Sequence, residues 1–79
     1  MSSLDFDPES QMSKLESEWR HAFETSLVAR AELQALAAIP NTHRYVIDQV
    51  RERLNRAEAL KALIMAKIER LEDSMLGND

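Results

Sequence analysis

The stretch ALAAIPNTHRYV, residues 35–46, holds the strongest interruption in a chain that otherwise favours helix throughout. Pro40 disfavours helical backbone at the residue before it, so a helix arriving from the N-terminal side should end just ahead of it. Asn41 or Thr42 can then cap a second helix, because their side-chain oxygens accept hydrogen bonds from free backbone N–H groups. The stretch therefore predicts a turn at residues 39–41 between two helices.

The chain on both sides of this turn carries further signals of helix boundaries. Asp7 is suited to cap a helix, and Pro8 directly after it occupies a position where no backbone donor is needed. Gly77, the single glycine, suits the end of a helix. Neither proline nor glycine interrupts the intervening segments, so the sequence predicts helices at residues 8–38 and 42–76.

Two long helices with so short a connection must be antiparallel neighbours. The predicted fold is all-α, an antiparallel two-helix hairpin over residues 8–76, with a flexible leader at residues 1–7 and a C-terminal tail at residues 77–79. The 79 residues contain no cysteine, which excludes disulfides. No apolar run approaches the roughly 20 residues that a membrane span needs. The formal net charge is −4, and the start of the chain is acidic, unlike a basic signal peptide. We therefore expect a cytoplasmic protein that binds no membrane.

Apolar and small residues recur at alternating steps of three and four in both predicted helices, as in the seam of a coiled coil. The first seam contains Met12, Leu15, Trp19, Ala22, Ser26, Ala29, Leu33 and Leu36. The second contains Ile47, Val50, Leu54, Ala57, Lys61, Ile64, Ile68, Leu71 and Met75. Small residues in the middle of the seams predict close helix packing, with a shallow groove for another protein's side chain as the alternative. Trp19 is the predicted anchor of the core.

Several large apolar side chains fall outside both seams, although each helix of a hairpin can cover only one stripe of the other. These residues are Phe23, Leu27, Tyr45, Leu60 and Leu63. Leaving them in water forgoes several kcal/mol at about 25 cal/mol per Å², which is comparable to the whole stability of a small domain. We therefore predict that they bind a helical protein partner or another copy of the chain, which completes the hairpin to a helical bundle.

Residue spacing gives no support to a catalytic, cofactor or metal site. Glu18 and His21 have the Glu-x-x-His spacing of di-iron bundles, but helical geometry turns His21 away from the seam and toward solvent. A single glycine excludes a glycine-rich phosphate loop. An enzyme with its site between two subunits would depend on the charged residues near the seams, Arg30 and Lys61. We predict a protein that is not an enzyme and has no cofactor.

A second hypothesis is a homodimeric four-helix bundle with a regulatory role that contacts nucleic acid through Arg51, Arg53 and Arg56. Acidic residues such as Asp48 and Glu52 are interleaved with these arginines. Nucleic-acid binding usually starts from a strongly basic face, and a net negative chain repels a polyanion. The sequence therefore favours protein–protein interaction over nucleic-acid binding.

A further pattern consists of Leu27 through Leu36, the turn Ile39-Pro40-Asn41-Thr42, and His43-Arg44-Tyr45-Val46 leading to Leu60, Leu63 and Ile64. Through these residues the chain, over residues 15–71, resembles the small co-chaperones of type III secretion needle subunits. The resemblance implies an acidic cytoplasmic hairpin that pairs with a larger helical-repeat chaperone. Together the two would hold the needle subunit unpolymerised.

Overall fold

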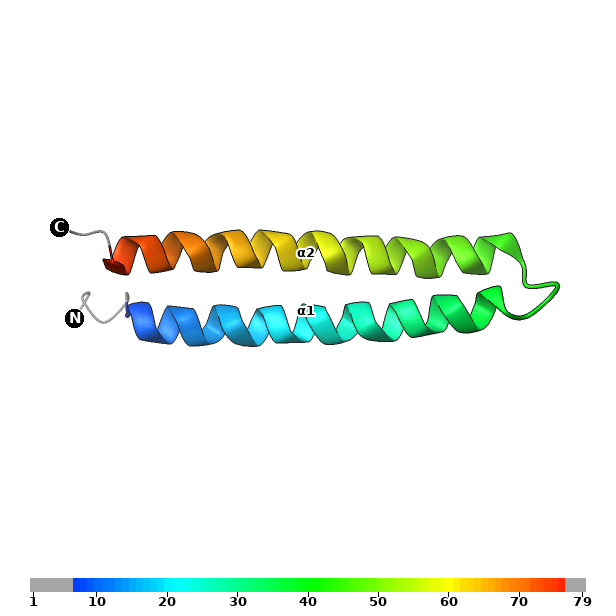
Figure 1. The fold of residues 1–79 in the computed structure, drawn as a ribbon, viewed down its shortest axis with the longest axis horizontal. Helices are drawn as coiled ribbons and strands as arrows, with labels where there is room; N and C mark the ends of the chain where they lie inside the picture. The colour runs from blue at the N-terminus through cyan, green and yellow to red at the C-terminus, as the bar shows by residue number, and fades with distance from the viewer. Residues whose placement is uncertain (1–6, 77–79) are drawn as a thin grey trace.

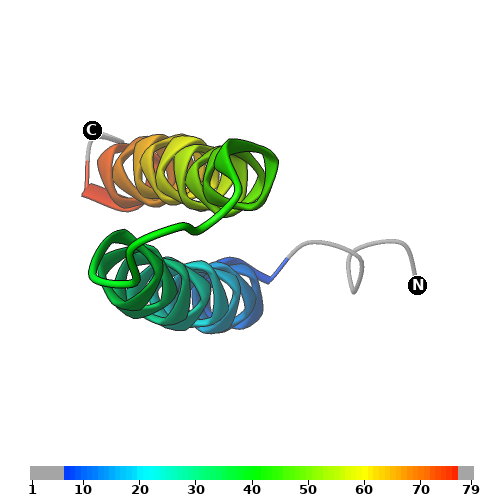
Figure 2. The same ribbon diagram turned by 90° about the vertical axis from the view of Figure 1, so that its right-hand side faces the viewer.

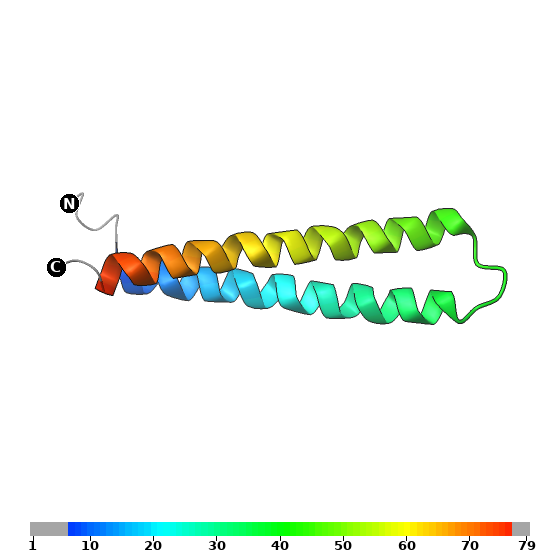
Figure 3. The same cartoon turned by 45° about the horizontal axis from the view of Figure 1, so that its top comes forward.

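The computed structural model describes residues 7–76 and contains two helices, α1 (Pro8–Ala37) and α2 (Arg44–Leu76). The helices run antiparallel, with the turn at one end of the rod (Figure 1) and a shallow crossing between them (Figure 3). Viewed toward the turn, they form one layer (Figure 2). The molecule extends 59 × 25 × 15 Å, and the shortest dimension accommodates a single layer of helices. The predicted all-α antiparallel hairpin is confirmed.

The start of α1 follows the predicted cap. Asp7 has extended backbone, and its Oδ1 accepts a hydrogen bond from the Glu9 N–H at 3.2 Å. Pro8 lies in the first turn, and the Glu9 carboxylate lies at the positive end of the helix dipole. The remainder of the predicted leader, residues 1–6, and the predicted tail, residues 77–79, lie outside the described residues.

The end of α1 comes at Ala37, one residue before the predicted end. The Thr42 hydroxyl lies 3.1 Å from the Leu36 carbonyl oxygen and 3.0 Å from that of Ile39, so it donates to the carboxyl end of α1. The last carbonyls of a helix have no partner within the helix, and Thr42 supplies one. The Thr42 side chain therefore connects the turn to the end of α1 by hydrogen bonds.

The start of α2 lies at Arg44, two residues after the predicted start, and its cap differs from the prediction. His43 Nδ1 accepts the Tyr45 N–H at 3.1 Å, which is the hydrogen bond that a capping side chain makes. Asn41 instead adopts a positive φ of 78°, a conformation that asparagine tolerates better than most residues. The prediction of an Asn41 or Thr42 cap was wrong, because both residues shape the turn itself.

The two predicted seams form the core. Every seam residue is buried or half-buried except Met75, which is 42 % exposed in the last described turn of α2. The most deeply buried positions include small residues, namely Ala22, Ser26, Ala29 and Ala57, which are 1–5 % exposed. Their burial favours close helix packing over an open groove in the middle of the hairpin.

Ser26 is the one buried polar residue in the described part of the chain, and we predict that its hydroxyl contributes little to stability. The Ser26 Oγ donates to the Phe23 carbonyl oxygen at 2.7 Å, a bond within α1 that leaves the opposite helix untouched. Ser26→Ala should change the free energy of unfolding by no more than about 0.5 kcal/mol, since alanine also has the higher helix propensity. Urea unfolding followed by circular dichroism measures this; a loss above about 1 kcal/mol would contradict it.

Candidate functional site: two interaction surfaces

The large apolar side chains predicted to lie outside the seams are exposed. Phe23 is 36 % exposed, Leu27 46 %, Tyr45 61 %, Leu60 46 % and Leu63 53 %. The seams of the two helices cover each other and leave these side chains in water. Their role in partner binding stays a prediction, and their arrangement decides what kind of surface they can form.

Two ion pairs between the helices mark the two sides of the hairpin. Arg30 Nη2 lies 2.9 Å from Glu58 Oε2, and Arg53 Nη1 lies 3.1 Å from Glu32 Oε1. Arg30 directly follows one seam residue of α1, and Glu32 directly precedes the next, so they project to opposite sides of the seam. We call these the Arg30–Glu58 side and the Glu32–Arg53 side.

The predicted binding residues divide between these sides. Phe23 is seven residues before Arg30, two helical turns away, and Leu27 is three residues before it, so both lie on the Arg30–Glu58 side. Leu60 is seven residues after Arg53, and Leu63 lies three residues further, which places both on the Glu32–Arg53 side. The five residues therefore do not form one patch.

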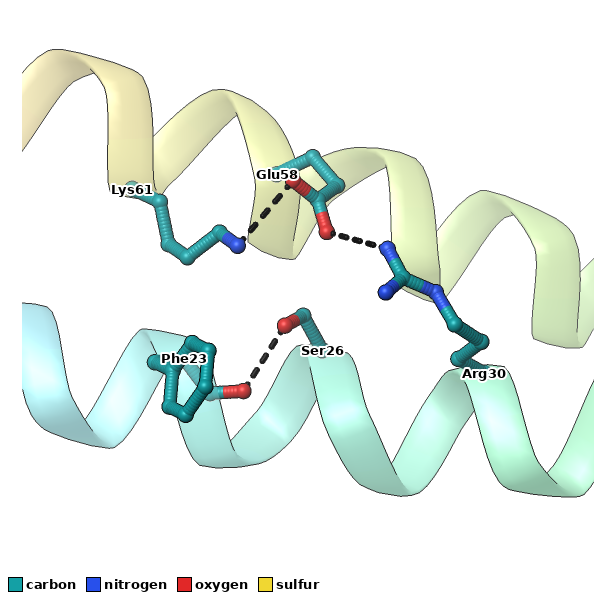
Figure 4. Close-up of polar contacts among 5 residues, drawn as sticks. All are labelled: Phe23, Ser26, Arg30, Glu58 and Lys61. Carbon is teal, nitrogen blue, oxygen red and sulfur yellow. Dashed lines mark hydrogen bonds and ion pairs between the residues drawn. The ribbon is translucent and has the colours of Figure 1, made fainter.

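The Arg30–Glu58 side carries an aromatic and ionic cluster (Figure 4). The Phe23 ring stacks on Trp19 with centroids 5.2 Å apart and planes 9° from parallel. Lys61 Nζ lies 5.2 Å from the Phe23 centroid and 3.2 Å from Glu58 Oε1. The Lys61 side chain, 19 % exposed, thus covers the seam with its aliphatic part and brings its charge to this side.

Met65 belongs to the same side, although it was not among the predicted binding residues. It directly follows Ile64 in the α2 seam, as Phe23 directly follows Ala22 in the α1 seam, and it is 38 % exposed. We call the group Phe23, Leu27, Ala62 and Met65 the Phe23 surface. It is an apolar area in the middle of the rod, with side chains from both helices.

The Glu32–Arg53 side carries a basic stripe along α2. At alternating steps of three and four, this stripe contains Arg53, Arg56, Leu60, Leu63, Lys67 and Arg70, with no acidic residue among them. Arg53 pairs with Glu32, and Arg56 with Glu52 at 3.1 Å, but Lys67 and Arg70 have no ion pair within residues 7–76. We call this stripe the Leu60 surface.

An open groove of about 780 Å³ continues the Leu60 surface toward the ends of the chain. Lys14 of α1 and Lys67 and Arg70 of α2 line it, with Leu15 and Leu71 of the seams between them. The acidic residues Asp7 and Glu18 also border it. The groove is wide and shared by both helices, which suits a side chain of a bound protein better than a small molecule.

Tyr45 lies apart from both surfaces, in the first turn of α2. Its hydroxyl oxygen accepts a hydrogen bond from Gln49 Nε2 at 2.9 Å, and its ring meets His43 edge-on with centroids 6.5 Å apart. These contacts hold the ring along its own helix while 61 % of the residue stays exposed. Tyr45 is therefore a pre-ordered aromatic side chain at the turn end of the rod.

The candidate residues for other chemistry are dispersed. Glu18 and His21 are both exposed, as expected, and residues 7–76 contain no group of three His, Asp or Glu side chains that could hold a metal. Arg30 and Lys61, considered for an enzyme site between subunits, both pair with Glu58. The arrangement offers charged contacts at a surface rather than a pocket with converging reactive groups.

The three arginines considered for nucleic-acid binding do not form one basic face. Arg51 pairs with Asp48 at 3.5 Å and directly follows a seam residue, which places it on the Arg30–Glu58 side. Arg53 and Arg56 lie on the opposite side, each near a carboxylate. Neither α1 nor α2, within the described range, is long and apolar enough to cross a membrane.

Comparison of the chain with protein-family models, curated proteins and solved structures finds no match. The resemblance of residues 15–71 to the type III secretion co-chaperones therefore stays a prediction.

Proposed function

We propose that this protein is a non-enzymatic protein–protein interaction module, a small chaperone or adaptor subunit that binds a helical partner through its apolar flanks. One observation carries the proposal: several buried seam positions hold small residues, while large apolar side chains outside the seams stay exposed. Ala22 and Ala29 are 1–2 % exposed, whereas Leu60 and Leu63 are about half exposed. Covering such side chains on binding supplies hydrophobic free energy that the single layer of helices does not obtain alone.

The residues of the Leu60 surface indicate which chemistry a heteromeric partner would have. Leu60 and Leu63 provide an apolar centre, and cations lie on both sides of it along α2, with Lys67 and Arg70 free of ion pairs to described residues. The complementary ligand is an amphipathic helix with apolar residues in its middle and Asp or Glu on either side. Opposite charges at the rim would set the register and speed association, while the leucines supply affinity.

The resemblance to needle-subunit co-chaperones supplies a biological setting for this proposal. In that setting the partner is a larger helical-repeat chaperone, the complex keeps a needle subunit unpolymerised, and the protein is cytoplasmic. An acidic chain of 79 residues with an exposed leucine stripe is compatible with such a role. The physical proposal of a helical partner does not depend on the setting.

A homodimeric four-helix bundle is the alternative, and the charge pattern around Phe23 favours it for that side of the hairpin. A regulatory contact with nucleic acid has less support. Arg51, Arg53 and Arg56 each lie within 4 Å of a carboxylate, which offsets the positive charge that phosphate binding needs.

The partner proposal predicts that the double substitution Leu60→Asp with Leu63→Asp weakens the heteromeric complex by at least about 100-fold. Each leucine buried at an interface contributes roughly 1.5–3 kcal/mol, and the new carboxylates would meet acidic residues of the partner. Tagged protein is purified from its native source, the complex is quantified by mass spectrometry, and helicity is followed by circular dichroism. Helicity should be retained, because both side chains lie outside the core.

Ala59→Asp with Ala66→Asp is the matched control, since it adds the same charge at exposed positions away from the stripe. This variant should keep the partner. Equal loss of helicity and binding in the leucine variant would mean that Leu60 and Leu63 serve the hairpin itself. Recovery of self-associated protein alone from the native source would contradict a heteromeric role.

A further inference from the structure

We propose that a second copy of this chain docks on the Phe23 surface and forms a two-fold four-helix bundle in which both turns lie at the same end. In this dimer α1 of each copy packs over α2 of the other. The proposal goes beyond the heteromeric function, because it uses the opposite side of the hairpin from the Leu60 surface. The two proposals can therefore fail independently.

The first support is the apolar centre of the Phe23 surface. The Arg30–Glu58 ion pair joins the two helices at one height along the rod. Phe23 lies seven residues before Arg30, and Met65 lies seven residues after Glu58, which in antiparallel helices is the same direction along the rod. These two side chains therefore lie at the same height along the rod, 36 % and 38 % exposed. A facing copy with its turn at the same end would bring Phe23 of each copy over Met65 of the other.

Leu27 extends this centre by one turn toward the hairpin's turn, and the residue nearest its height on the same side of α2 is Ala62. Leu27 is 46 % exposed, while Ala62 has only a methyl group. A large side chain over a small one is the arrangement that lets facing helices interdigitate. The apolar area of one copy thus matches that of the other when α1 faces α2.

The second support is the charge at the two ends of this apolar area. On α1, Arg20 and Arg30 lie on either side of Phe23 and Leu27, and both are cations. On α2, Glu58 and Glu69 bracket Ala62 and Met65, and both are anions. Arg20, three residues before Phe23, and Glu69, four residues after Met65, lie within about 1.5 Å of the same height, the rise of one helical residue. The two charges that border the apolar area are therefore both positive on α1 and both negative on α2.

This pattern distinguishes the two ways in which identical hairpins can stack face to face. With turns at the same end, Arg20 lies over Glu69 of the second copy and Arg30 over Glu58, so the four contacts that border the apolar area are attractive. One turn further from the hairpin's turn, Glu16 lies over Glu72, a like-charge contact that offsets part of this attraction. With turns at opposite ends, α1 lies over α1, which sets Arg20 over Arg30 and Glu58 over Glu69. Every charge contact is then repulsive. Electrostatic complementarity therefore selects the first arrangement.

The same stacking on the Glu32–Arg53 side is less well matched. Counting from the Glu32–Arg53 pair, Glu32 would meet Arg53 of the second copy and Glu18 would meet Lys67, which are attractive contacts. Lys14 would meet Arg70, however, and Val28 would meet Arg56. Leu60 would lie over Thr25, so the apolar centre of this side has no apolar counterpart in the second copy, and self-association there is less favourable. A dimer built on the Phe23 surface leaves both Leu60 surfaces facing outward for other proteins.

Reversing the charge at one matched position tests the proposal. Sedimentation equilibrium of the full chain over about 1 to 200 μM should show a dimer of 9.1 kDa subunits whose dissociation constant rises in high salt. Arg20→Glu and Glu69→Arg should each raise that constant at least about 10-fold, because each change appears twice in the dimer. The double variant Arg20→Glu with Glu69→Arg should restore it to within about 3-fold of the original value.

Three outcomes would overturn the proposal. A chain that stays monomeric across the concentration range has no such dimer. Single variants that dimerise as well as the original protein place the interface elsewhere. Tighter dimerisation by Arg20→Glu alone would indicate turns at opposite ends, since the new carboxylate would then face Arg30.

Matched controls separate this result from the heteromeric proposal. Glu24→Arg makes the same charge change at an exposed position of α1 outside both surfaces, and it should leave the dimer intact. Leu60→Asp with Leu63→Asp should also leave the dimer intact while it removes the partner. Circular dichroism of each variant at low concentration checks that the hairpin itself is unchanged.

Discussion

Trp19→Ala is expected to lower the free energy of unfolding by about 3 kcal/mol, the lower end of the range for removing a large aromatic side chain from a core. Trp19 is half-buried against the core cluster of Ala22, Ile64 and Ile68. Its ring also stacks on Phe23, which would lose that support. The substitution thus removes packing from the core and from the Phe23 surface at once.

The effect should be large relative to the whole because the hairpin has few large buried residues. A chain of 79 residues has a typical stability of about 4–12 kcal/mol, and within residues 7–76 three of the seven buried apolar residues are alanines. Urea unfolding followed by circular dichroism, at one fixed protein concentration, measures the change. The midpoint should fall steeply with an unchanged slope.

Trp19→Phe is the control, since a smaller ring at this position keeps the stack on Phe23 and most of the core contacts. It should cost about 1 kcal/mol. A loss below 1 kcal/mol for Trp19→Ala would mean that the core tolerates the cavity, and that Trp19 acts at the surface. If Trp19→Phe lowered the free energy of unfolding as much as Trp19→Ala, the contribution of Trp19 would come from the part of the indole that phenylalanine lacks.

The core of this fold could be predicted from sequence because a hairpin of long helices keeps one periodicity from end to end. Small residues such as Ala22 and Ser26 were placed in the seam by spacing alone, and both are buried. Met75 was placed there by the same rule and is exposed. It lies in the last described turn of α2, and the spacing of apolar residues does not show at which turn the mutual burial of the two helices ends.

The predicted turn, residues 39–41, lies within the observed connection of residues 38–43, but the hydrogen bonds of this connection differ from the prediction. Several residues there could cap a helix, and composition alone does not rank them. The positive φ of Asn41 changes the direction of the chain, after which the Thr42 hydroxyl reaches back to α1 and His43 reaches forward to α2. Which residue caps each helix therefore depends on the backbone geometry of the turn, and residue preferences do not determine that geometry.

The positions of the seams predicted that the binding residues lie outside the core. That these residues lie on two opposite sides of the hairpin was not predicted. In an antiparallel pair, the residue after a seam position on one helix lies beside the residue after a seam position on the other. Phe23 and Met65 each follow a seam residue, so this rule places them on the same side of the hairpin. Leu60 precedes a seam residue, so the rule places it on the opposite side. The signal was therefore present in the spacing, and Met65 could have been found by it.

Ala29→Leu is expected to lower the free energy of unfolding by about 2 kcal/mol, because it would overfill the closest part of the hairpin. Ala29 is 1 % exposed, and Ala57 of α2 is 5 % exposed. These alanines directly precede Arg30 and Glu58, whose ion pair joins the helices at this height. A leucine has no room between the backbones and would push the helices apart.

The exposed Ala31 provides the matched control for this substitution, because it lies on the outer face of the same helix. Ala31→Leu adds the same atoms with similar helix propensity and should change stability by less than about 0.5 kcal/mol. The pair of variants decides between two interpretations of the small residues in the seams. If the small residues permit close packing, only Ala29→Leu destabilises the hairpin. If they leave a groove for another protein's side chain, the new leucine fills it, stability rises, and the binding site lies between the helices instead of on their outer sides.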